Sequence, residues 1–330
     1  MSVVLVTGGA GFLGSHIAEE LVNLGHKVVV LDDLSGGFKD NVPCGAFFVK
    51  GSVTDHRLVE KLFLKWKFEY VFHLAAYAAE NLSVFIKRFN YTNNLIGSVN
   101  LINESVKNKV KRFIFTSSIA VYGSQTPPFS EDLKPCPVDS YGIAKFTVEQ
   151  ELRITKEIFG LDYVIFRPHN VYGERQNTGD KYRNVMGIFL SQLMNNKPLT
   201  IFGDGEQTRQ FSYIKDVAPI IAKAAFDERF NCGIFNIGSD RVYSVNKIAK
   251  VICEAFGKPD TQIKHLRKRH EVVHAACSHK KLKDMGFLQN ETPLEEGILK
   301  MVEWTKKVGI RKSKTFKNIE IREGLPEGWE

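Results

Sequence analysis

The sequence predicts an α/β protein in which a doubly wound parallel sheet is followed by a smaller C-terminal α/β lobe. A buried-strand pattern over 3–7 runs into spaced glycines and then into a helix pattern. Short apolar runs then alternate with helical patterns, an order typical of parallel sheets covered by helices. After Arg167 the chain changes to loops rich in Gly, Asn and Asp. We therefore expect a Rossmann-type first domain over 1–168 and a second lobe over 169–330, with the chain able to cross between them.

The individual elements follow from the same patterns. Apolar runs predict strands over 3–7, 27–31, 47–49, 70–74, 113–116 and 162–167. Helical periodicity predicts helices from Ser15, over 84–109 and 141–159, and near 184–196, 215–227 and 244–256. The tail after Arg311 has little periodicity, and we expect it to fold over the second lobe or to fray.

Three glycines after the first strand predict a dinucleotide-binding loop. Gly8, Gly11 and Gly14 stand where the chain turns tightly, where backbone approaches a pyrophosphate, and where helix packs on strand. A plain strand-turn-helix would also tolerate glycine, but Asp32 ends the second strand at about the ~20-residue spacing of a ribose ligand. A carboxylate there binds the adenosine ribose hydroxyls and repels a 2′-phosphate, so NAD is favoured over NADP.

Composition argues against several other classes. No run approaches ~20 apolar residues, and no leader-like segment precedes the first strand, so we expect a cytoplasmic protein without a membrane contact. The five cysteines form no C-x-x-C pair and the nine histidines show no ligand spacing, so no metal site is expected. The net charge of +8 is spread along the chain, which does not favour a nucleic-acid partner.

A Tyr-x-x-x-Lys pair supplies candidate reacting groups. Tyr141 and Lys145 stand one helical turn apart and so share a face. The chain holds a second such pair, Tyr243 and Lys247, and the surroundings separate the two. Tyr141 opens the helix after the fifth strand, which ends in the hydroxyl residues 116–118, whereas Tyr243 lies in the later lobe. We therefore assign the chemistry to Tyr141 and Lys145.

These features together resemble the extended short-chain dehydrogenase/reductase family, and most closely its NAD-dependent nucleotide-sugar epimerases of the UDP-glucose 4-epimerase type. The resemblance covers nearly the whole chain up to about residue 300. The motifs that carry it are Thr-Gly-Gly-Ala-Gly-Phe-Leu-Gly at 7–14, Asp32, Leu-Ala-Ala at 74–76, Ser-Ser at 117–118, Val-Tyr-Gly at 121–123, Tyr-Gly-Ile-Ala-Lys at 141–145, and Arg-Pro-His-Asn-Val-Tyr-Gly at 167–173.

The resemblance implies a catalytic role for each of three residues. Tyr141 would act as base on the sugar 4-hydroxyl, Ser118 would hydrogen-bond the reacting oxygen, and Lys145 would hold the nicotinamide ribose. Lys145 and the positive nicotinamide ring would lower the phenol pKa toward neutrality. Because the cofactor is regenerated in each cycle, NAD should stay bound between turnovers.

The resemblance also implies the binding residues. The first domain would hold NAD through Gly8, Gly11, Phe12, Leu13, Asp32, Ser52, Val53, Leu74, Ala75, Ala76, Asn94, Tyr141, Lys145 and Pro168. Ser52 departs from the more usual aspartate. The second lobe would hold the UDP-sugar through Asn170, Asn184, Phe202, Arg209, Arg269 and Glu271, with Ser118 from the first domain; the basic ligand could fall anywhere in 267–269. The helices over 84–109 and 141–159 would pair two copies into a homodimer.

The reaction is narrowed by the residues after Ser118. Dehydratases and decarboxylases of the family place an acid there, whereas this chain has Ile119 and Ala120. Reductases usually use NADPH, which Asp32 opposes, and a catalytically silent NAD-sensing scaffold would lack part of the triad. We therefore expect interconversion of UDP-glucose and UDP-galactose.

Two other UDP-sugars stay open at this point. A small Ala275 at the expected pocket wall would leave room for N-acetylhexosamines. UDP-glucuronate is the alternative substrate, because Arg175, Thr178 and Arg183 stand close enough in sequence to Asn170 to bind a C6 acid. Asn170 itself favours a neutral hexose, because UDP-glucuronate epimerases often carry Thr at its position.

Overall fold

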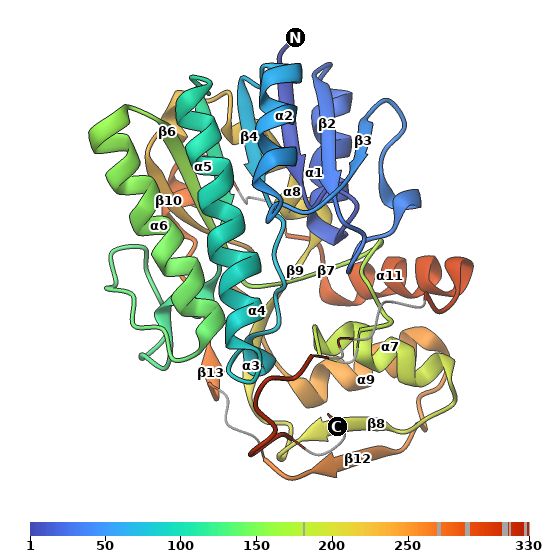
Figure 1. Cartoon of the computed structure of the whole chain (residues 1–330). Coiled ribbons are helices and arrows are strands. Elements are labelled where there is room, and N and C mark those ends of the chain that lie inside the picture. The colour runs from blue at the N-terminus through green and yellow to red at the C-terminus, as the bar shows by residue number, and fades with distance from the viewer. Residues whose placement is uncertain are drawn as a thin grey trace.

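The computed structural model describes residues 1–180, 182–268, 272–287, 291–311, 316, 318–326 and 329. A parallel sheet of seven strands forms the first lobe, in the order β10-β6-β5-β4-β1-β2-β3 (Figure 1). Its strands are β1 (Val3–Thr7), β2 (Lys27–Asp32), β3 (Phe47–Lys50), β4 (Tyr70–His73), β5 (Arg112–Thr116), β6 (Asp162–Pro168) and β10 (Gly233–Ile237). The doubly wound parallel sheet predicted from the sequence is confirmed.

Helices cover both faces of this sheet because alternate strand residues point to opposite sides and nearly all of them are apolar. On one face Leu5, Val29 and Phe113 pack with residues of three helices, α2 (His56–Trp66), α5 (Gly97–Lys107) and α6 (Ser140–Phe159). On the other face Val6 and Phe166 pack with α1 (Phe12–Asn23) and α8 (Ile214–Ala224). The carboxyl ends of the strands stay uncovered by these helices and point toward the second lobe (Figure 1).

The predicted helix over 84–109 begins later in the structure, at Lys87, and contains a π-helical turn. It comprises α4 (Lys87–Tyr91), the turn over Thr92–Ile96, and α5, and a separate short helix, α3 (Glu80–Ser83), precedes it. Two long-range contacts stabilise this arrangement: Glu320 accepts hydrogen bonds from the first amides of α4, and Asn94 bonds the main chain of Tyr77. Neither contact can be recognised from helical periodicity.

The second lobe combines helices with short strands. Its helices are α7 (Val185–Met194), α9 (Val245–Phe256), α10 (Lys280–Asp284) and α11 (Leu294–Val308), and its strands are β7 (Asn170–Tyr172), β8 (Leu199–Phe202), β9 (Thr208–Tyr213), β11 (Val242–Ser244), β12 (Ile263–Leu266) and β13 (His274–Ala275). Three 3₁₀ turns, Lys39–Asn41, Ile119–Tyr122 and Glu228–Phe230, complete the elements named. Strand β9 is paired with β7, β11 and β13, and β8 with β12.

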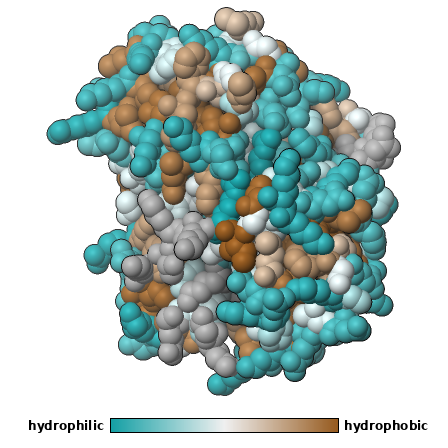
Figure 2. All heavy atoms as spheres, turned by 90° about the vertical axis from the view of Figure 1, so that its right-hand side faces the viewer, coloured by the Kyte–Doolittle hydropathy of each residue, from teal (hydrophilic) through white to brown (hydrophobic). Residues whose placement is uncertain are grey.

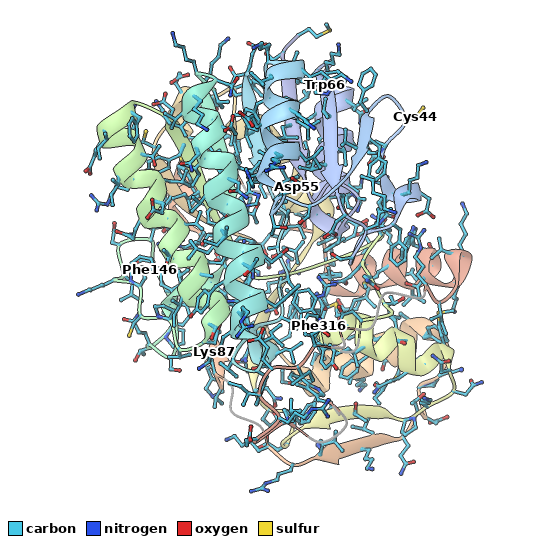
Figure 3. All side chains as sticks on the ribbon, viewed as in Figure 1. Cys44, Asp55, Trp66, Lys87, Phe146 and Phe316 are labelled. Atoms are coloured by element: carbon cyan, nitrogen blue, oxygen red, sulfur yellow. The ribbon has the colours of Figure 1, made fainter. Side chains whose placement is uncertain are left out.

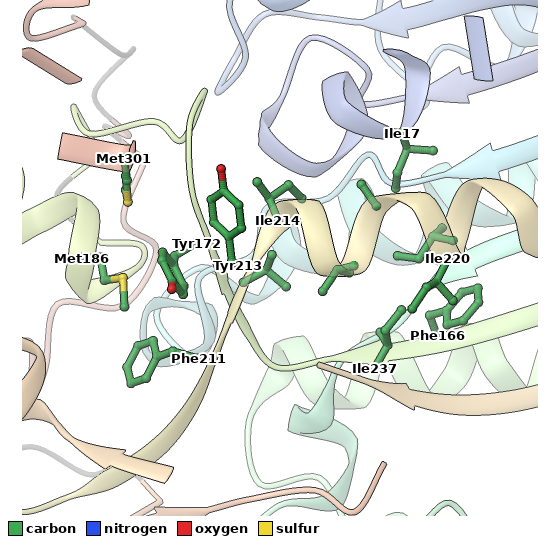
Figure 4. Close-up of a cluster of buried hydrophobic side chains, with 14 of the residues drawn as sticks. Ile17, Phe166, Tyr172, Met186, Phe211, Tyr213, Ile214, Ile220, Ile237 and Met301 are labelled. Atoms are coloured by element: carbon green, nitrogen blue, oxygen red, sulfur yellow. The ribbon is translucent and has the colours of Figure 1, made fainter. Parts of the chain in front are cut away.

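One buried core joins the two lobes. Figure 4 shows Ile17 and Phe166 of the first lobe in the same cluster as Tyr172, Met186 and Met301 of the second. Helix α8 and strand β10 follow residue 169 in sequence, yet they return to the first lobe, where α8 packs on α1 and β10 pairs with β6. This crossing fixes the orientation of the lobes across the cavity between them.

The C-terminal tail packs against α3 and α4 of the first lobe. Phe316, Ile319 and Leu325 contact an apolar cluster that contains Leu82 and Ile86. The tail was expected to fold over the second lobe or to fray; its described residues pack on α3 and α4 of the first lobe, and Trp329 also contacts Tyr182 of the second. Aromatic and aliphatic side chains without helical spacing supply the contacts, so periodicity did not indicate them.

The described helices include none that is both long and apolar enough to cross a membrane. The face of the molecule in Figure 2 carries apolar side chains in separate patches among hydrophilic ones.

Candidate active site

A cavity of about 1470 Å³ lies between the carboxyl edge of the sheet and the second lobe. Residues of both lobes line it, from Gly8 and Asp32 at one end to Tyr141, Arg209 and Ala275 elsewhere along it. Its position follows the general rule that ligands of open α/β sheets bind beyond the carboxyl ends of the strands.

The glycine loop forms the dinucleotide end of the cavity. Gly8 has a φ of +70°, and a Cβ there would lie 2.7 Å from the main-chain nitrogen of Ala75. A Cβ on Gly14 would collide with the carbonyl oxygen of Gly8, so the helix could not approach the strand as closely. Among the described residues no side chain caps the start of α1, where Gly11, Phe12 and Leu13 line the cavity. Their amides are therefore placed for a pyrophosphate.

Asp32 lies at the end of β2 with only 8% of its surface exposed. Its Oδ1 accepts a hydrogen bond from the amide of Leu34 at 2.8 Å, and its Oδ2 accepts one from the amide of Ala10 at 3.0 Å. Burial raises the pKa of this carboxyl above its ordinary value, and these two amides counteract the rise. The carboxylate is thus held rigidly at the cavity wall, as a ligand of ribose hydroxyls requires.

The other expected cofactor residues lie along the same end, with one exception. Ser52, Val53, Leu74, Ala75, Ala76 and Pro168 all line the cavity. Asn94 lies behind the wall, where it accepts from the amide of Tyr77 at 2.8 Å and donates to the Tyr77 carbonyl at 3.1 Å. It stands in the π-helical turn, and its neighbour Asn93 lines the cavity instead. Asn94 therefore positions the loop after β4 rather than facing a ligand.

Ser118, Tyr141 and Lys145 meet where β5 ends and α6 begins. The side chain of Ser118 lies close enough to the Tyr141 phenol to act on its pKa. Lys145 donates to the carbonyl of Thr116 at 2.7 Å, and its Nζ lies 5.7 Å from the centre of the Tyr141 ring. All three side chains are buried and line the cavity. Helix α6 places them because Asp139 caps it, accepting from the amide of Gly142 at 2.8 Å.

Burial dominates the electrostatics of these groups. It raises the pKa of the Tyr141 phenol, the charge of Glu80 adds to the rise, and the interaction with the Ser118 side chain opposes it. Burial lowers the pKa of Lys145 to about 7, although the charge of Glu149 opposes this shift. The sequence predicts that Lys145 and the nicotinamide ring together lower the phenol pKa. The protein groups alone do not lower it, because desolvation penalises the phenolate more than nearby groups favour it.

The chain fits an NAD molecule along this wall. The close glycine contacts leave space where side chains would otherwise stand, and Asp32 supplies a buried ribose acceptor. The hydroxyl of Thr116 is buried without a hydrogen-bond partner among the described residues, and it lines the cavity beside Lys145. A buried hydroxyl of this kind usually has a partner, so its position suits a polar ligand group.

A buried ion pair behind the reacting groups was not foreseen from the sequence. Glu149 accepts from the Ser117 hydroxyl at 2.5 Å and from two nitrogens of Arg167 at 2.9 and 2.5 Å. The Glu149 and Arg167 side chains are at most 2% exposed. Glu149 lies one turn beyond Lys145, so a search along the face of Tyr141 and Lys145 would have found it. Because a glutamate on a helix is usually exposed to solvent, the sequence did not indicate that Glu149 is buried.

Those expected substrate residues that the structure describes line the wall formed by the second lobe. Asn170 donates to the carbonyl of Gln210 at 3.1 Å, and Asn184 donates to the carbonyl of Val171 at 3.1 Å. Arg209 donates to the carbonyls of Thr208 and Val273 at 2.8 and 2.9 Å and also to that of Val272. These three residues and Phe202 all line the cavity. Arg269 and Glu271 lie outside the described residues, although Arg267 and Lys268 line the cavity nearby.

Comparison with known proteins agrees with this geometry. Residues 4–238 match the model of the NAD-dependent epimerase/dehydratase family. A UDP-glucose 4-epimerase of Thermotoga maritima, solved with UDP-glucose, is similar at 35% identity and a TM-score of 0.86, over 93% of this chain and 99% of that one. A UDP-N-acetylglucosamine 4-epimerase of Methanobrevibacter ruminantium is similar at 32% identity and a TM-score of 0.85, over 93% and 99% of the two chains.

A third similar structure differs in its sugar. The UDP-glucuronic acid 4-epimerase of Bacillus cereus, solved with UDP-glucuronic acid and NAD, is 28% identical with a TM-score of 0.83, over 93% of this chain and 100% of that one. These relatives share a fold and are named for different UDP-sugars. The sugar must therefore be argued from the residues of this cavity.

Proposed function

This chain belongs to the NAD-dependent epimerase/dehydratase family, and on that premise we propose that it is a UDP-sugar 4-epimerase that interconverts UDP-glucose and UDP-galactose. The observation that carries the proposal is the meeting of Ser118, Tyr141 and Lys145 at one wall of the cavity, followed by the apolar Ile119 and Ala120. An acid directly after Ser118 would be needed as a further proton donor or acceptor for dehydration or decarboxylation.

Each reacting side chain has a distinct task. The glycine loop and Asp32 would hold NAD, which would supply reversible hydride transfer at C4 of the sugar. Tyr141 takes the proton from the 4-hydroxyl and gives it back. Ser118 hydrogen-bonds the same oxygen and fixes it next to the phenol. The positive charges of Lys145 and the nicotinamide ring together would favour the phenolate. The burial of all three side chains keeps water from the 4-keto sugar.

A second candidate, UDP-glucuronate, rests on Arg183. This residue lines the cavity, and its charge acts on the Tyr141 phenol. However, Arg183 donates to Asp180 at 2.7 Å, so its charge is already paired. The two other residues expected to help do not line the cavity: Arg175 pairs with Glu19 at 2.6 Å, and Thr178 is buried. A neutral hexose is therefore favoured.

The wall around Ala275 supports tolerance of N-acetylhexosamines. Ala275 lines the cavity from β13, which pairs with β9 so that Ala275 lies opposite Arg209. A methyl group there leaves more room than a large side chain would. We propose that UDP-N-acetylhexosamines are accepted beside the neutral hexoses.

We also propose a homodimer formed through α5 and α6. The outer surface of these helices exposes large apolar side chains: Ile96 just before α5 and Ile143, Ile154, Ile158 and Phe159 on α6 are 40–65% exposed. Two copies related by a two-fold axis would cover them. Light scattering at micromolar concentration should show twice the chain mass, and a monomer would contradict the proposal.

Incubation of the purified protein with single UDP-sugars tests the function. UDP-glucose should give UDP-galactose without added NAD, since the cofactor is regenerated. Acid release should yield NAD(H) from the protein as purified, and a predominance of NADP would overturn the role given to Asp32. A far higher kcat/KM for UDP-glucuronate would contradict the neutral-hexose assignment and leave the reaction type intact.

A further inference from the structure

The C-terminal tail crosses from the second lobe to the first. After α11 ends at Val308, the Arg311 guanidinium donates to Asp40 at 2.7 Å and to Asn41 at 3.0 Å. It also lies over the rings of Phe38 and Trp304. The first segment of the tail is therefore fixed near the 3₁₀ turn that follows β2.

A second anchor fixes the tail to α3 and α4. The amides of Glu320 and Ile321 donate to the carbonyl of Phe85 at 2.9 and 3.1 Å. The Glu320 carboxylate accepts from the amides of Arg88 and Phe89 at 2.8 and 2.9 Å, where α4 begins. A carboxylate at a helix N-terminus satisfies amides that have no partner within the helix.

Phe316 strengthens the same attachment. Its ring lies 4.7 Å from that of Phe89 and 5.4 Å from that of Tyr77, measured between ring centres. Figure 3 shows Phe316 beside α4, on the side that faces the second lobe. The described tail is thus held by ion pairs, hydrogen bonds and ring contacts at several points along its length.

Beyond these anchors the tail forms part of the cavity wall. Leu325, Pro326 and Trp329 line the cavity, and Trp329 is only 4% exposed. The Trp329 ring packs edge-on against Tyr182 at 5.2 Å, and the Tyr182 hydroxyl donates to the Trp329 carbonyl at 3.4 Å. Tail residues therefore connect the wall of the first lobe to a loop of the second.

This wall lies at the reacting end of the cavity. Leu325 and Trp329 belong to the apolar cluster that contains Ala79 and Leu82, the residues on either side of the 80–81 segment at the start of α3. The Ser83 hydroxyl of α3 accepts a hydrogen bond from the Tyr141 amide at 3.1 Å, so the helix on which the tail packs also contacts the start of α6. The adenine-ribose acceptor Asp32 stands at the other end. The tail thus lines the cavity next to the helix that contacts the start of α6 at Tyr141.

We propose that Leu325 and Trp329 are specificity-determining residues that form an apolar wall of the sugar subsite and disfavour a charged sugar. The inference rests on the proposed function, because it places the hexose beside Tyr141. A neutral hexose can lay its C–H groups on this wall at no cost. A C6 carboxylate pressed against leucine, proline and tryptophan would lose water without gaining a partner, since Arg183 is paired with Asp180.

The test uses the full chain with Trp329→Ala and Leu325→Ala. Calorimetry should show UDP-glucose binding weakened about tenfold or more in each variant, within the ~10–200-fold range of a lost pocket contact. Binding of UDP alone should change less than twofold. The ratio of kcat/KM for UDP-glucuronate to that for UDP-glucose should rise about tenfold, because the wall that excludes the carboxylate is removed.

Ile321→Ala is the matched control. Ile321 lies on the same tail, is 36% exposed and does not line the cavity, so both binding and the substrate ratio should stay as in the unaltered protein. Trp329→Phe retains a ring against Tyr182 and should give an intermediate effect, which keeps the test decisive if Trp329→Ala does not fold.

Two outcomes would overturn the proposal. One is unchanged UDP-glucose binding and an unchanged substrate ratio in both wall variants. The other is an equal loss of affinity for UDP and UDP-glucose, which would indicate a general disturbance rather than a sugar contact. If the unaltered protein epimerises no UDP-sugar, the proposed function fails, but the comparison of UDP with UDP-glucose still decides whether the tail contacts the sugar.

Discussion

The two ends of the cavity are built from different kinds of sequence. The dinucleotide end is formed by the loops after β1, β2, β3 and β4, all within the first 80 residues, and it relies on glycine contacts and backbone amides. The sugar end combines the start of α6, strands β9 and β13, and the C-terminal tail. Cofactor binding is thus encoded locally, whereas substrate selection depends on segments that meet only in the folded chain.

The largest expected effect lies where the two ends meet. Tyr141→Phe retains the ring but removes the ionisable oxygen, so epimerisation should fall by ~10²–10⁴-fold, the range for a lost general base. Binding of UDP and retention of NAD should change little, because neither end of the cavity is altered. Turnover of UDP-glucose and calorimetry with UDP measure these effects.

Tyr243→Phe is the matched control for that variant. Tyr243 begins the second Tyr-x-x-x-Lys pair, stands in β11 and does not line the cavity. Its turnover should equal that of the unaltered protein. Equal losses at both tyrosines would remove the reason for assigning the chemistry to Tyr141.

Gly14→Ala tests the dinucleotide end alone. The added Cβ would collide with the carbonyl oxygen of Gly8, so α1 must move from the loop at a cost of ~1–3 kcal/mol in the free energy of unfolding. The protein should then lose most of its NAD during purification. Gly25→Ala, at a φ of +82° with no atom within 4 Å, separates the cost of backbone strain from the cost of collision. If Gly25→Ala loses as much NAD, the close contact is not the cause.

Ala275→Tyr tests the sugar end alone. The large ring should close the wall beside β13 and lower kcat/KM for UDP-N-acetylglucosamine by ~10–200-fold relative to UDP-glucose. NAD content should not change, because β13 is remote from the glycine loop. An equal decrease for both sugars would show that Ala275 does not discriminate between them.

The smallest predicted effect is a pH dependence of the free energy of unfolding, to which a buried histidine near each end of the cavity should contribute equally. His73, behind the dinucleotide end, and His169, near the sugar end, are buried, and burial lowers the pKa of each to about 3. Between the ordinary pKa of about 6.5 and pH 3 the unfolded chain binds one more proton at each site. The free energy of unfolding should therefore fall as the pH is lowered, by ~1.4 kcal/mol per pH unit for each histidine.

Chemical denaturation at several pH values measures this dependence. His73→Gln and His169→Gln should each reduce the slope by about one proton. A slope unaffected by both buried substitutions would show that these rings are not neutral in the folded protein.

The difference between the two ends also explains what could be predicted from the sequence. The first six strands of the sheet, the glycine loop, Asp32 and the Tyr141–Lys145 pair were all recognisable because each depends on neighbours within one or two elements. Strand β10 was not recognised as part of the sheet, because its partner β6 lies more than sixty residues earlier.

The features that the sequence did not reveal share one physical cause. The break before α4 depends on Glu320, the wall beside Tyr141 depends on Trp329, and Glu149 is buried only because Arg167 and Ser117 meet it from two strands. In each case a distant partner decides the conformation or the burial. Local periodicity contains no information about such partners.

The central claim is that C4 of a UDP-sugar is oxidised and reduced again within this cavity. UDP-glucose that carries deuterium at C4 tests it most directly, with the product analysed by mass spectrometry and NMR after incubation in ordinary water. The account predicts UDP-galactose with the deuterium still at C4, because the same hydride is removed and returned. Loss of the label to water, or its absence from C4 of the product, would contradict the account.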